Sequence, residues 1–377
     1  MRELFHVPQW FSHVLASVDM GSSTGLLDSV CRRPFEGMEI LWDGSVHLCI
    51  PGWLPVCVGN VSELSIAEVW NSSAAKELRE SVRDGSFSNC LGQNCPYLTT
   101  WRTAGRADEA SPIVPVNEAS EYARGEQPLW PVNLSLSYDY TCTLDCEMCR
   151  SGIRRVQPGS QDDQRFSRIT DEVLRALPHV ARLNIGLNGE PFDSRHYMRI
   201  LSALHSDQHP NLQVALLTNG LGLTKQRLSQ FEQRGVLFES VEVAVDAATA
   251  ETYEALRRRG RFPVLLENLS AISEFRRRGA IRHLALSYVV QASNYREMAS
   301  FVSLANQVGV DRILFRPLDD WKVMSAERFA KKAVHDRRHP EHEQFRALLA
   351  DPIFQAKSID LGGLGALIAD EPSGQVT

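Results

Sequence analysis

Three cysteines in one short loop are the residues of this sequence best suited to chemistry. Cys142, Cys146 and Cys149 are separated by three and then two residues, and they follow a β-rich stretch directly. This spacing lets one loop place its sulfurs around a single inorganic cluster, and cysteine thiolates are the usual ligands of a [4Fe–4S] cubane. Because a cubane has four irons, three thiolates leave one iron open, and an open position distinguishes a catalytic metal site from a structural one.

A zinc ion is the main alternative for this loop, and an accidental grouping of three cysteines is the other. A zinc site would need a histidine to complete it. His179 and His196 are the nearest downstream candidates, and neither has zinc-finger spacing from the cysteines. We therefore favour the iron–sulfur interpretation.

A second group of cysteines lies near the N-terminus. It consists of two pairs, Cys31 with Cys49 and Cys90 with Cys95. Between the pairs, the Asp43-Gly44 turn predicts a hairpin over residues 42–49, and an amphipathic helix is predicted over residues 66–83 with Ser65 as its cap. Together the pairs supply four thiolates, which on coordination grounds alone suit either a [4Fe–4S] cluster or a zinc ion.

Strand and helix signals alternate through the second part of the chain. Strands are predicted at 132–140, 182–187, 212–217, 240–245, 283–290 and 312–315, and helices at 170–181, 194–206, 224–235, 250–260 with 264–279, and 294–308. Thr170 and Thr224 are the expected caps of two of these helices. The alternation predicts an α/β fold, a (β/α)6 partial TIM-like barrel with its chemistry at the carboxyl ends of parallel strands.

Composition and charge set the broad class of protein. The 377 residues are 43% hydrophobic and carry a formal net charge of −6, which gives no support for binding nucleic acid. Residues 1–30 do not resemble a secretion signal, and no apolar run is long enough for a membrane span, so we expect a cytoplasmic protein without a membrane partner. Two arginine runs, 257–259 and 276–278, precede glycines and are interpreted as cations at helix ends.

The cysteine distribution also divides the chain. Residues 1–98 are expected to form a small cysteine-rich domain, and residues 99–130, rich in charge, Pro, Gly and Ala, a linker. The barrel then spans 131–318. A helical, charged extension follows over 319–377 and is expected to fray from about Asp370.

The cysteine loop and its place after the first strand resemble the radical S-adenosylmethionine (radical SAM) superfamily over about residues 132–318. That resemblance implies that the open iron chelates the methionine part of S-adenosylmethionine, that reductive cleavage releases a 5′-deoxyadenosyl radical, and that the radical abstracts a substrate hydrogen. Met148 then lies beside the adenine. The sequence from Asn188 through Gly189 and Glu190 to Pro191 resembles the family's GGEP motif, which binds the methionine amine; carboxylate and carbonyl oxygens suit an ammonium. Asn219 and Asp246, at later strand ends, are expected near the cofactor and its ribose.

The N-terminal cysteines resemble the SPASM/twitch auxiliary-cluster domain of the same superfamily. Its opening pattern, C-x(9–15)-G-x4-C, is met by Cys31, Gly44 and Cys49. The resemblance implies one auxiliary [4Fe–4S] cluster held by Cys31, Cys49, Cys90 and Cys95. The domain usually follows the barrel, whereas here it precedes it.

The expected activity is that of a radical SAM oxidoreductase or epimerase acting on a peptide, sugar-type or other small-molecule substrate, with an external electron donor such as flavodoxin or ferredoxin. Cys57, the remaining cysteine, is a buried apolar residue, a substitute cluster ligand or a thiol that donates hydrogen to a substrate radical. A non-catalytic iron–sulfur or zinc scaffold that binds a partner is the alternative function. A zinc hydrolase would need a His/Asp ligand set that the sequence does not offer.

Overall fold

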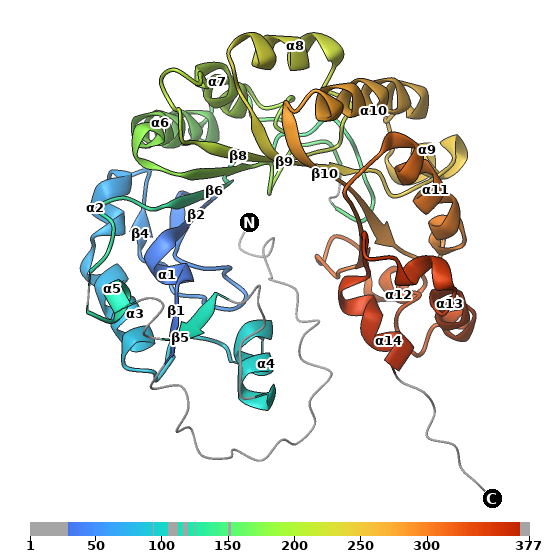
Figure 1. Ribbon diagram of the computed structural model, residues 1–377, viewed down its shortest axis with the longest axis horizontal. Coiled ribbons are helices and arrows are strands. Elements are labelled where there is room, and N and C mark those ends of the chain that lie inside the picture. The colour runs from blue at the N-terminus through green and yellow to red at the C-terminus, as the bar shows by residue number, and fades with distance from the viewer. Residues whose placement is uncertain are drawn as a thin grey trace, which may run out of the picture.

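One long curved sheet dominates the molecule (Figure 1). The computed structural model describes residues 29–92, 94–104, 112–115, 120–124, 126–149 and 152–369, so the N-terminal stretch before residue 29 and the tail from Asp370 lie outside the described residues. Within the described part, ten strands pair in the order β12-β11-β10-β9-β8-β7-β6-β2-β3-β4. The order is open, because its two end strands do not pair with each other.

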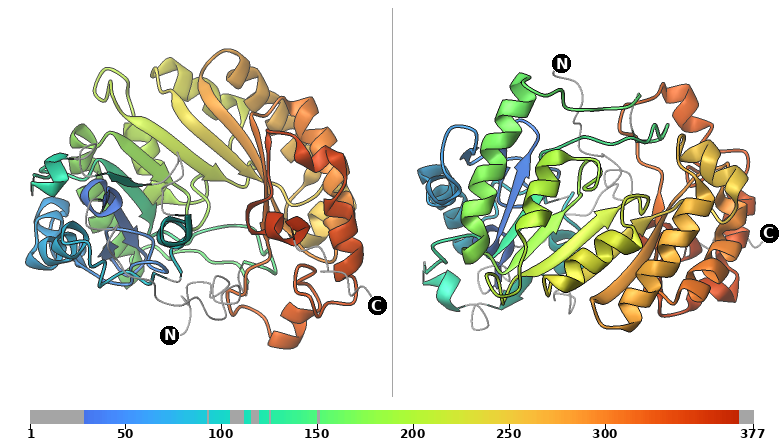
Figure 2. Two further views of the ribbon diagram at one scale, coloured as in Figure 1. Left: turned by 60° about the horizontal axis from the view of Figure 1, so that its bottom comes forward. Right: turned by 90° about the horizontal axis from the view of Figure 1, so that it is seen from above.

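Six parallel strands form the centre of the sheet. They are β6 (Asn133–Ser137), β7 (Arg182–Ile185), β8 (Gln213–Thr218), β9 (Phe238–Ala244), β10 (Ile281–Val290) and β11 (Arg312–Pro317). The connecting helices are α6 (Gln161–Ala176), α7 (Arg195–Ala203), α8 (Lys225–Gln233), α9 (Ala250–Leu256), α10 (Phe262–Arg277) and α11 (Met298–Val308). They cover the outer, convex face of the sheet (Figures 1 and 2). The predicted α/β class and partial barrel are confirmed.

Capping shows where local sequence signals succeed and fail. Thr224 caps α8 by accepting from the Arg227 N–H, as predicted. Thr170 does not cap a helix: it is buried in the middle of α6, which begins nine residues earlier behind the Ser160 cap. The Thr170 hydroxyl donates to the Phe166 carbonyl at 2.6 Å.

The N-terminal module pairs directly with the first barrel strand. Its elements are β1 (Ser29–Cys31), α1 (Arg33–Glu36), β2 (Gly37–Leu41), β3 (Ser45–His47), β4 (Gly59–Asn60), α2 (Ile66–Trp70) and α3 (Ser73–Arg83). The predicted hairpin is β2–β3, and the predicted long helix is two helices, because the Ser72 hydroxyl caps a new one. Strand β2 runs parallel to β6 in continuous register, from Gly37 opposite Asn133 to Leu41 opposite Ser137. Module and barrel therefore share one hydrophobic core.

The segment predicted as a linker is attached to this module in several places. It contributes most of α4 (Pro96–Ala104), together with β5 (Ile113–Pro115) and α5 (Ser120–Ala123), and β5 pairs antiparallel with β1. The Tyr122 ring stacks on Phe35 at 5.0 Å between centroids, and the Trp70 indole donates to the Pro128 carbonyl at 2.8 Å. The division of the chain into domains stays a prediction.

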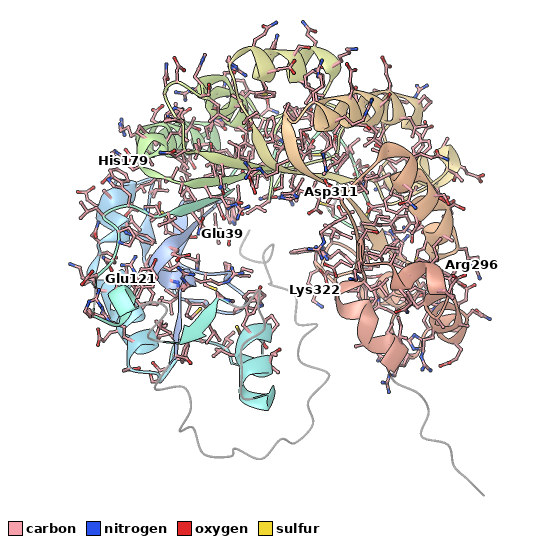
Figure 3. All side chains as sticks on the ribbon, viewed as in Figure 1. Glu39, Glu121, His179, Arg296, Asp311 and Lys322 are labelled. Atoms are coloured by element: carbon pink, nitrogen blue, oxygen red, sulfur yellow. The ribbon has the colours of Figure 1, made fainter. Side chains whose placement is uncertain are left out.

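The C-terminal extension closes the other end of the sheet. It contains α12 (Ala326–Ala330), α13 (His342–Leu349), the two-residue strand β12 (Ile359–Asp360) beside β11, and α14 (Ala366–Ala369). Figure 3 shows Glu39 of the module and Lys322 of the extension on the concave side of the sheet. None of the helices in the described part of the chain has the length and hydropathy needed to cross a bilayer.

Candidate functional site

The cysteine loop follows β6 and is held in place by backbone hydrogen bonds from distant parts of the chain. The Cys142 N–H donates to the Arg154 carbonyl at 3.0 Å, and the Asp145 N–H donates to the Arg258 carbonyl at 3.2 Å. Cys142 and Cys146 are buried, whereas Cys149 is exposed. A small apolar cluster packs around the buried cysteines and contains Leu144, Met148 and Leu318. The loop is thus a fixed structure with one accessible side.

The Asn188–Pro191 turn touches the start of this loop. The Glu190 N–H donates to the Thr141 carbonyl at 2.7 Å. Gly189 has φ +75°, and a Cβ there would overlap the Asp139 carbonyl oxygen and lie 2.9 Å from that of Thr141. Only glycine allows so close an approach of two backbones. Two motifs about forty residues apart in sequence are therefore brought together at the carboxyl ends of β6 and β7.

The Glu190 carboxylate ties the turn to the end of β8. It accepts hydrogen bonds from the Thr218 hydroxyl and the Asn219 N–H, both at 2.7 Å, and from the Phe192 N–H at 3.2 Å. Burial raises the pKa of Glu190 to about 7, although these hydrogen bonds oppose the rise. Glu190 thus connects its own turn to the cysteine loop and to the end of β8. An ammonium ligand would have to share the Glu190 carboxylate oxygens with the donors already bound to them.

The side chains of Asn219 and Asp246 are also engaged within the protein. Asn219 Oδ1 accepts from the Leu221 N–H at 2.9 Å. Asp246, which has φ +66°, accepts from the Val289 N–H at 2.7 Å and from the Arg257 guanidinium, whose Nη2 lies 2.6 Å from Oδ2. Both residues lie at strand ends on the active face, and their contacts with a cofactor stay a prediction.

Arg257 is a site residue that the sequence interpretation missed. The interpretation as helix-end cations holds for the second arginine run, which ends α10 and pairs with Asp311 and Glu232. Arg257 likewise ends a helix, as the residue that follows α9, but its largely covered side chain also pairs with Asp246 and lies beside Cys146. Burial alone would lower the pKa of Arg257, and the two neighbouring groups, Asp246 first, raise it above its ordinary value. No local pattern marks this arginine as different from its neighbours.

Arg258 next to it holds the cysteine loop. Its Nε donates to the Asp145 carbonyl at 2.8 Å, and the Asp145 carboxylate lies 3.5 Å away. Arg257 and Arg258, which directly follow α9, therefore both contact the cysteine loop in addition to lying at a helix end.

The donor set of the loop fits an iron–sulfur cluster better than a zinc ion. Among the described residues, no three His, Cys, Asp or Glu side chains are grouped closely enough to hold one metal ion. Ligands of a cubane need not be so close, because each thiolate binds a different iron. Both histidines of the zinc alternative are engaged elsewhere: His179 stacks on Trp130, and His196 hydrogen-bonds Asp163 at 3.0 Å.

The four N-terminal cysteines lie close to one another. Cys31 ends β1, Cys49 follows β3, and Cys90 and Cys95 flank the turn before α4. Burial and the three neighbouring thiols raise the pKa of Cys31 far above its ordinary value, and burial raises that of Cys49 to about 11, although Arg33 opposes the rise. Four neighbouring thiolates would repel one another, so without a metal these cysteines favour the protonated thiol form. Metal binding would release those protons, as is usual for cysteine ligand sets.

Cys57 differs from the other N-terminal cysteines. It is exposed, and its thiol donates to the Gly59 carbonyl at 3.2 Å. The interpretation as a buried apolar residue is therefore wrong, since the loop before β4 leaves this side chain at the surface. The two other interpretations, cluster ligand and hydrogen donor, stay predictions.

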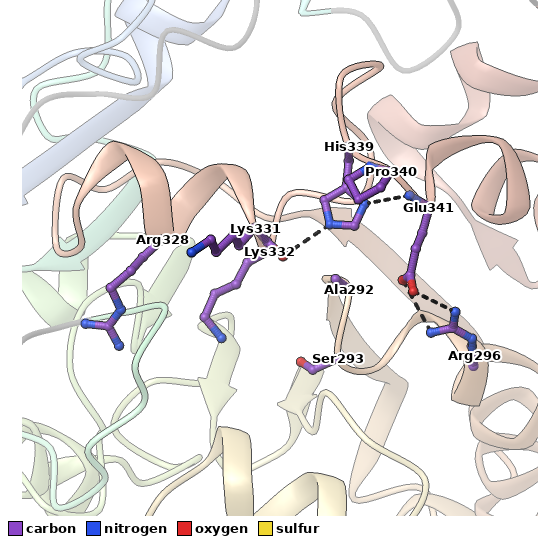
Figure 4. A pocket seen from close by; sticks show the side chains of 9 residues that line it. All are labelled: Ala292, Ser293, Arg296, Arg328, Lys331, Lys332, His339, Pro340 and Glu341. Atoms are coloured by element: carbon purple, nitrogen blue, oxygen red, sulfur yellow. Dashed lines mark hydrogen bonds and ion pairs between the residues drawn. The ribbon is translucent and has the colours of Figure 1, made fainter.

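A cavity of about 620 Å³ lies between the barrel and the C-terminal extension (Figure 4). It is lined by Ala292, Ser293, Arg296, Arg328, Lys331, Lys332, His339, Pro340 and Glu341. Arg328 and Lys332 both pair with Glu147, which stands between Cys146 and Met148 in the cysteine loop. The cavity therefore has a mainly cationic lining and adjoins the loop.

Two family models match the chain. Residues 31–96 match SPASM, an iron–sulfur cluster-binding domain, and residues 137–304 match the radical SAM superfamily. The mycofactocin maturase MftC of Mycobacterium ulcerans is 26% identical over 246 residues, which are 63% of this chain and 62% of that protein. A GTP 3′,8-cyclase of Corynebacterium glutamicum is 34% identical over 109 residues, 26% of this chain and 28% of that protein. The chain thus spans less than two thirds of either relative.

Solved structures also resemble the chain. Streptococcus suis SuiB bound to the precursor peptide SuiA has a TM-score of 0.44 and 13% identity over 82% of this chain and 67% of that one. Native anSMEcpe with bound AdoMet has a TM-score of 0.35 and 15% identity over 47% of this chain and 48% of that one.

Proposed function

Because the chain belongs to the radical SAM superfamily and carries an N-terminal SPASM iron–sulfur domain, we propose that it is an oxidoreductase or epimerase that abstracts hydrogen from a peptide or sugar-type substrate. S-adenosylmethionine and a [4Fe–4S] cluster are the cofactors of this superfamily, and the SPASM domain binds auxiliary iron–sulfur. The observation that supports the proposal most strongly is the contact between the cysteine loop and the Asn188–Pro191 turn through Thr141 and Glu190.

Cys142, Cys146 and Cys149 are the proposed ligands of the catalytic cluster. When bound there, the cluster and S-adenosylmethionine supply a 5′-deoxyadenosyl radical, as the superfamily implies. The chain's own residues bind and orient the cofactor and exclude water. Met148 would provide an apolar surface for the adenine. The backbone carbonyl oxygens of the Asn188–Pro191 turn would accept hydrogen bonds from the methionine amine. The engaged Glu190, Asn219 and Asp246 side chains would hold these loops in position.

Cys31, Cys49, Cys90 and Cys95 are the proposed ligands of one auxiliary cluster. Four thiolates complete the coordination of a cubane, so this site would have no open iron for a substrate. A closed site is suited to electron transfer or to stabilising the module, and electron transfer out of a substrate radical would give a net oxidation. The external donor that reduces the catalytic cluster is proposed to be a flavodoxin or ferredoxin.

The cationic cavity beside the cysteine loop is the proposed place for part of the substrate. Its lining includes four Lys and Arg side chains and one carboxylate, Glu341, which is already paired with Arg296 at 3.0 Å. Ammonium and guanidinium groups have several donors each, so a carboxylate or phosphate group of the substrate would find partners here. The cavity also lies at the carboxyl end of β10, the end at which barrels of this kind place their chemistry.

Anaerobic reconstitution tests this function directly. The full-length protein should bind about eight irons, four for each cubane. With dithionite and S-adenosylmethionine it should form 5′-deoxyadenosine, and a deuterated substrate should transfer its label to that product. Bound metal without cofactor cleavage would support instead the alternative of a non-catalytic iron–sulfur scaffold that binds a partner.

A further inference from the structure

Arg33 lies beside the four N-terminal cysteines in an unusual environment. It is the first residue of α1, two positions after Cys31, and its amide N–H donates to the Cys31 sulfur. Its guanidinium carbon lies 5.3 Å from the centroid of the Trp53 ring and 5.4 Å from that of Tyr97. The guanidinium thus lies against two aromatic rings that themselves pack edge to face, 5.7 Å apart between centroids, and aromatic rings favour a cation.

This arginine has no carboxylate partner in the described part of the chain. None of the ion pairs there includes it, and its buried Nε lacks a hydrogen-bond partner. One carboxyl group that it influences is Glu39, which is half-buried and accepts a hydrogen bond from the Ser137 hydroxyl across the β2–β6 pair. Tyr97, against which the guanidinium lies, packs on the same apolar cluster as Cys31, Cys90 and Cys95, so the cation is on the side of the module that carries these cysteines. Burial opposes a raised pKa of Arg33, and Cys49, followed by Tyr97 and Cys31, raises it above its ordinary value. A partly buried cation is stabilised by a counter-charge, and the grouped cysteines, as thiolates, would supply one in addition to Glu39.

We propose that the Arg33 guanidinium is the charge partner of the auxiliary cluster and raises its reduction potential. This inference rests on the proposed assignment of Cys31, Cys49, Cys90 and Cys95 as ligands. A cubane with four thiolates is an anion, and reduction adds one more negative charge. A fixed cation beside it stabilises the reduced form more than the oxidised form, and net charge is one of the properties that set cluster potentials. The cluster becomes a better acceptor of an electron from a substrate radical.

The test compares matched arginine variants in the full-length chain. Cys142, Cys146 and Cys149 are first replaced by Ala, so that only the auxiliary cluster is observed, and its midpoint potential is measured by an EPR-monitored redox titration. Arg33→Met fills the space beside the rings without charge, Arg33→Gln keeps polarity, and Arg33→Lys keeps charge. Arg32→Gln is the control, because Arg32 is adjacent, 43% exposed and already paired with Glu36 at 3.1 Å.

Arg33→Met and Arg33→Gln should each lower the ratio of reduced to oxidised cluster at a fixed potential by about tenfold, equivalent to about 59 mV for one electron. Arg33→Lys and Arg32→Gln should stay within about twofold of the parent. Equal midpoints in the neutral variants and the parent would overturn the inference. Loss of auxiliary iron from both neutral variants while they stay folded would also overturn it, in favour of a structural role.

Different outcomes contradict the four-cysteine assignment and the role of Arg33. A parent that binds no iron would contradict the four-cysteine assignment together with the role of Arg33. A loaded parent whose midpoint does not respond to the neutral Arg33 variants contradicts the role of Arg33 alone.

Discussion

The two cysteine sites of this molecule are built in opposite ways. The loop at Cys142–Cys149 takes its three thiols from eight consecutive residues and relies on a neighbouring turn, α9 and the C-terminal extension to hold it. The N-terminal site collects four cysteines from separate elements around a short hairpin. A single loop can leave one side of a cluster open to a ligand, whereas ligands that converge from several directions close it. An open metal site therefore depends on the segments that support its loop, and a closed one depends on the fold of its module.

Cys142→Ala gives the largest expected effect on this comparison. Loss of one of three ligands should abolish formation of 5′-deoxyadenosine, by about a thousandfold or more, since no chemistry remains without the cofactor. The iron content should fall from about eight to about four per chain, because the auxiliary cluster is independent. Mass spectrometry of the nucleoside and iron analysis after anaerobic reconstitution measure both. Retention of eight irons with full cleavage would contradict the assignment of the loop.

Cys95→Ser provides the reciprocal experiment. It should also leave about four irons, but cleavage of S-adenosylmethionine should stay within about threefold of the parent, because distant sites behave independently. If the auxiliary cluster accepts an electron from the substrate radical, substrate oxidation should be lost. The exposed Cys57→Ser is the matched control and should keep all iron. Equal losses in both serine variants would indicate that Cys57 is a ligand.

Gly189→Ala tests the contact on which the open site depends. The added methyl group meets the backbone of the cysteine loop at a residue with φ +75°, so the free energy of unfolding should fall by about 2–4 kcal/mol. Gly279→Ala is the control: its φ is +84°, but nothing lies within 4 Å of the new Cβ, so only about 1 kcal/mol is expected. Urea unfolding of the metal-free chains measures the difference. Equal costs would mean that the close approach is unimportant.

Glu190→Gln sharpens the comparison through pH. The folded-state pKa of Glu190 is raised to about 7, so the folded chain binds this proton more tightly than the unfolded chain. Stability from this group is therefore present below the unfolded pKa, near 4.5, and is lost as pH rises toward 7. The parent should lose about 1–3 kcal/mol more than the Gln variant between pH 5 and pH 7.5 in urea unfolding. The control Glu343→Gln, at an exposed position, should show the same pH dependence as the parent. If the unfolding free energy of the parent and of both variants changed with pH in the same way, the raised pKa of Glu190 would be contradicted.

Lys332→Gln has the smallest expected effect. This lysine is mostly buried at the cavity and lies 3.5 Å from Glu147. If the cavity binds an anionic group of the substrate, KM should rise about three- to tenfold with little change in kcat. The control is Lys225→Gln, an exposed residue of α8 that pairs with Glu274. An unchanged KM for substrates with and without an anionic group would remove the cavity from the proposed site.

The features that the sequence predicted correctly are mostly local. All six barrel strands lie within a few residues of their predicted bounds, because continuous apolar runs mark buried parallel strands. The loop cysteines and the Asn188–Pro191 turn were recognisable because their types and spacing are unusual. The cap at Thr224 was correct, but the one at Thr170 was not, because the polar first turns of α6 resemble a loop until Ser160 is recognised as the cap.

The features that could not be predicted depend on contacts between distant segments. Nothing near β2 in the sequence specifies that it pairs with β6, almost one hundred residues later, because pairing preferences are set by context. Arg257 acquires its role only when α9 brings it to Asp246 and Cys146. The short strand β12 has too few residues to show a period.

The parallel pairing of β2 with β6 has a consequence for how this protein can be handled and how it can fail. Strand β6 is the first strand of the barrel, and β2 is its neighbour on one side. Without the N-terminal residues, the backbone N–H and C=O groups on that side of β6 would be an exposed strand edge, next to the apolar side chains of Leu134 and Leu136 that are now buried. Exposed strand edges pair with strands of other chains and so lead to aggregation. A polypeptide that began at residue 131 should therefore precipitate on expression, and a stable barrel would need another strand supplied in place of β2.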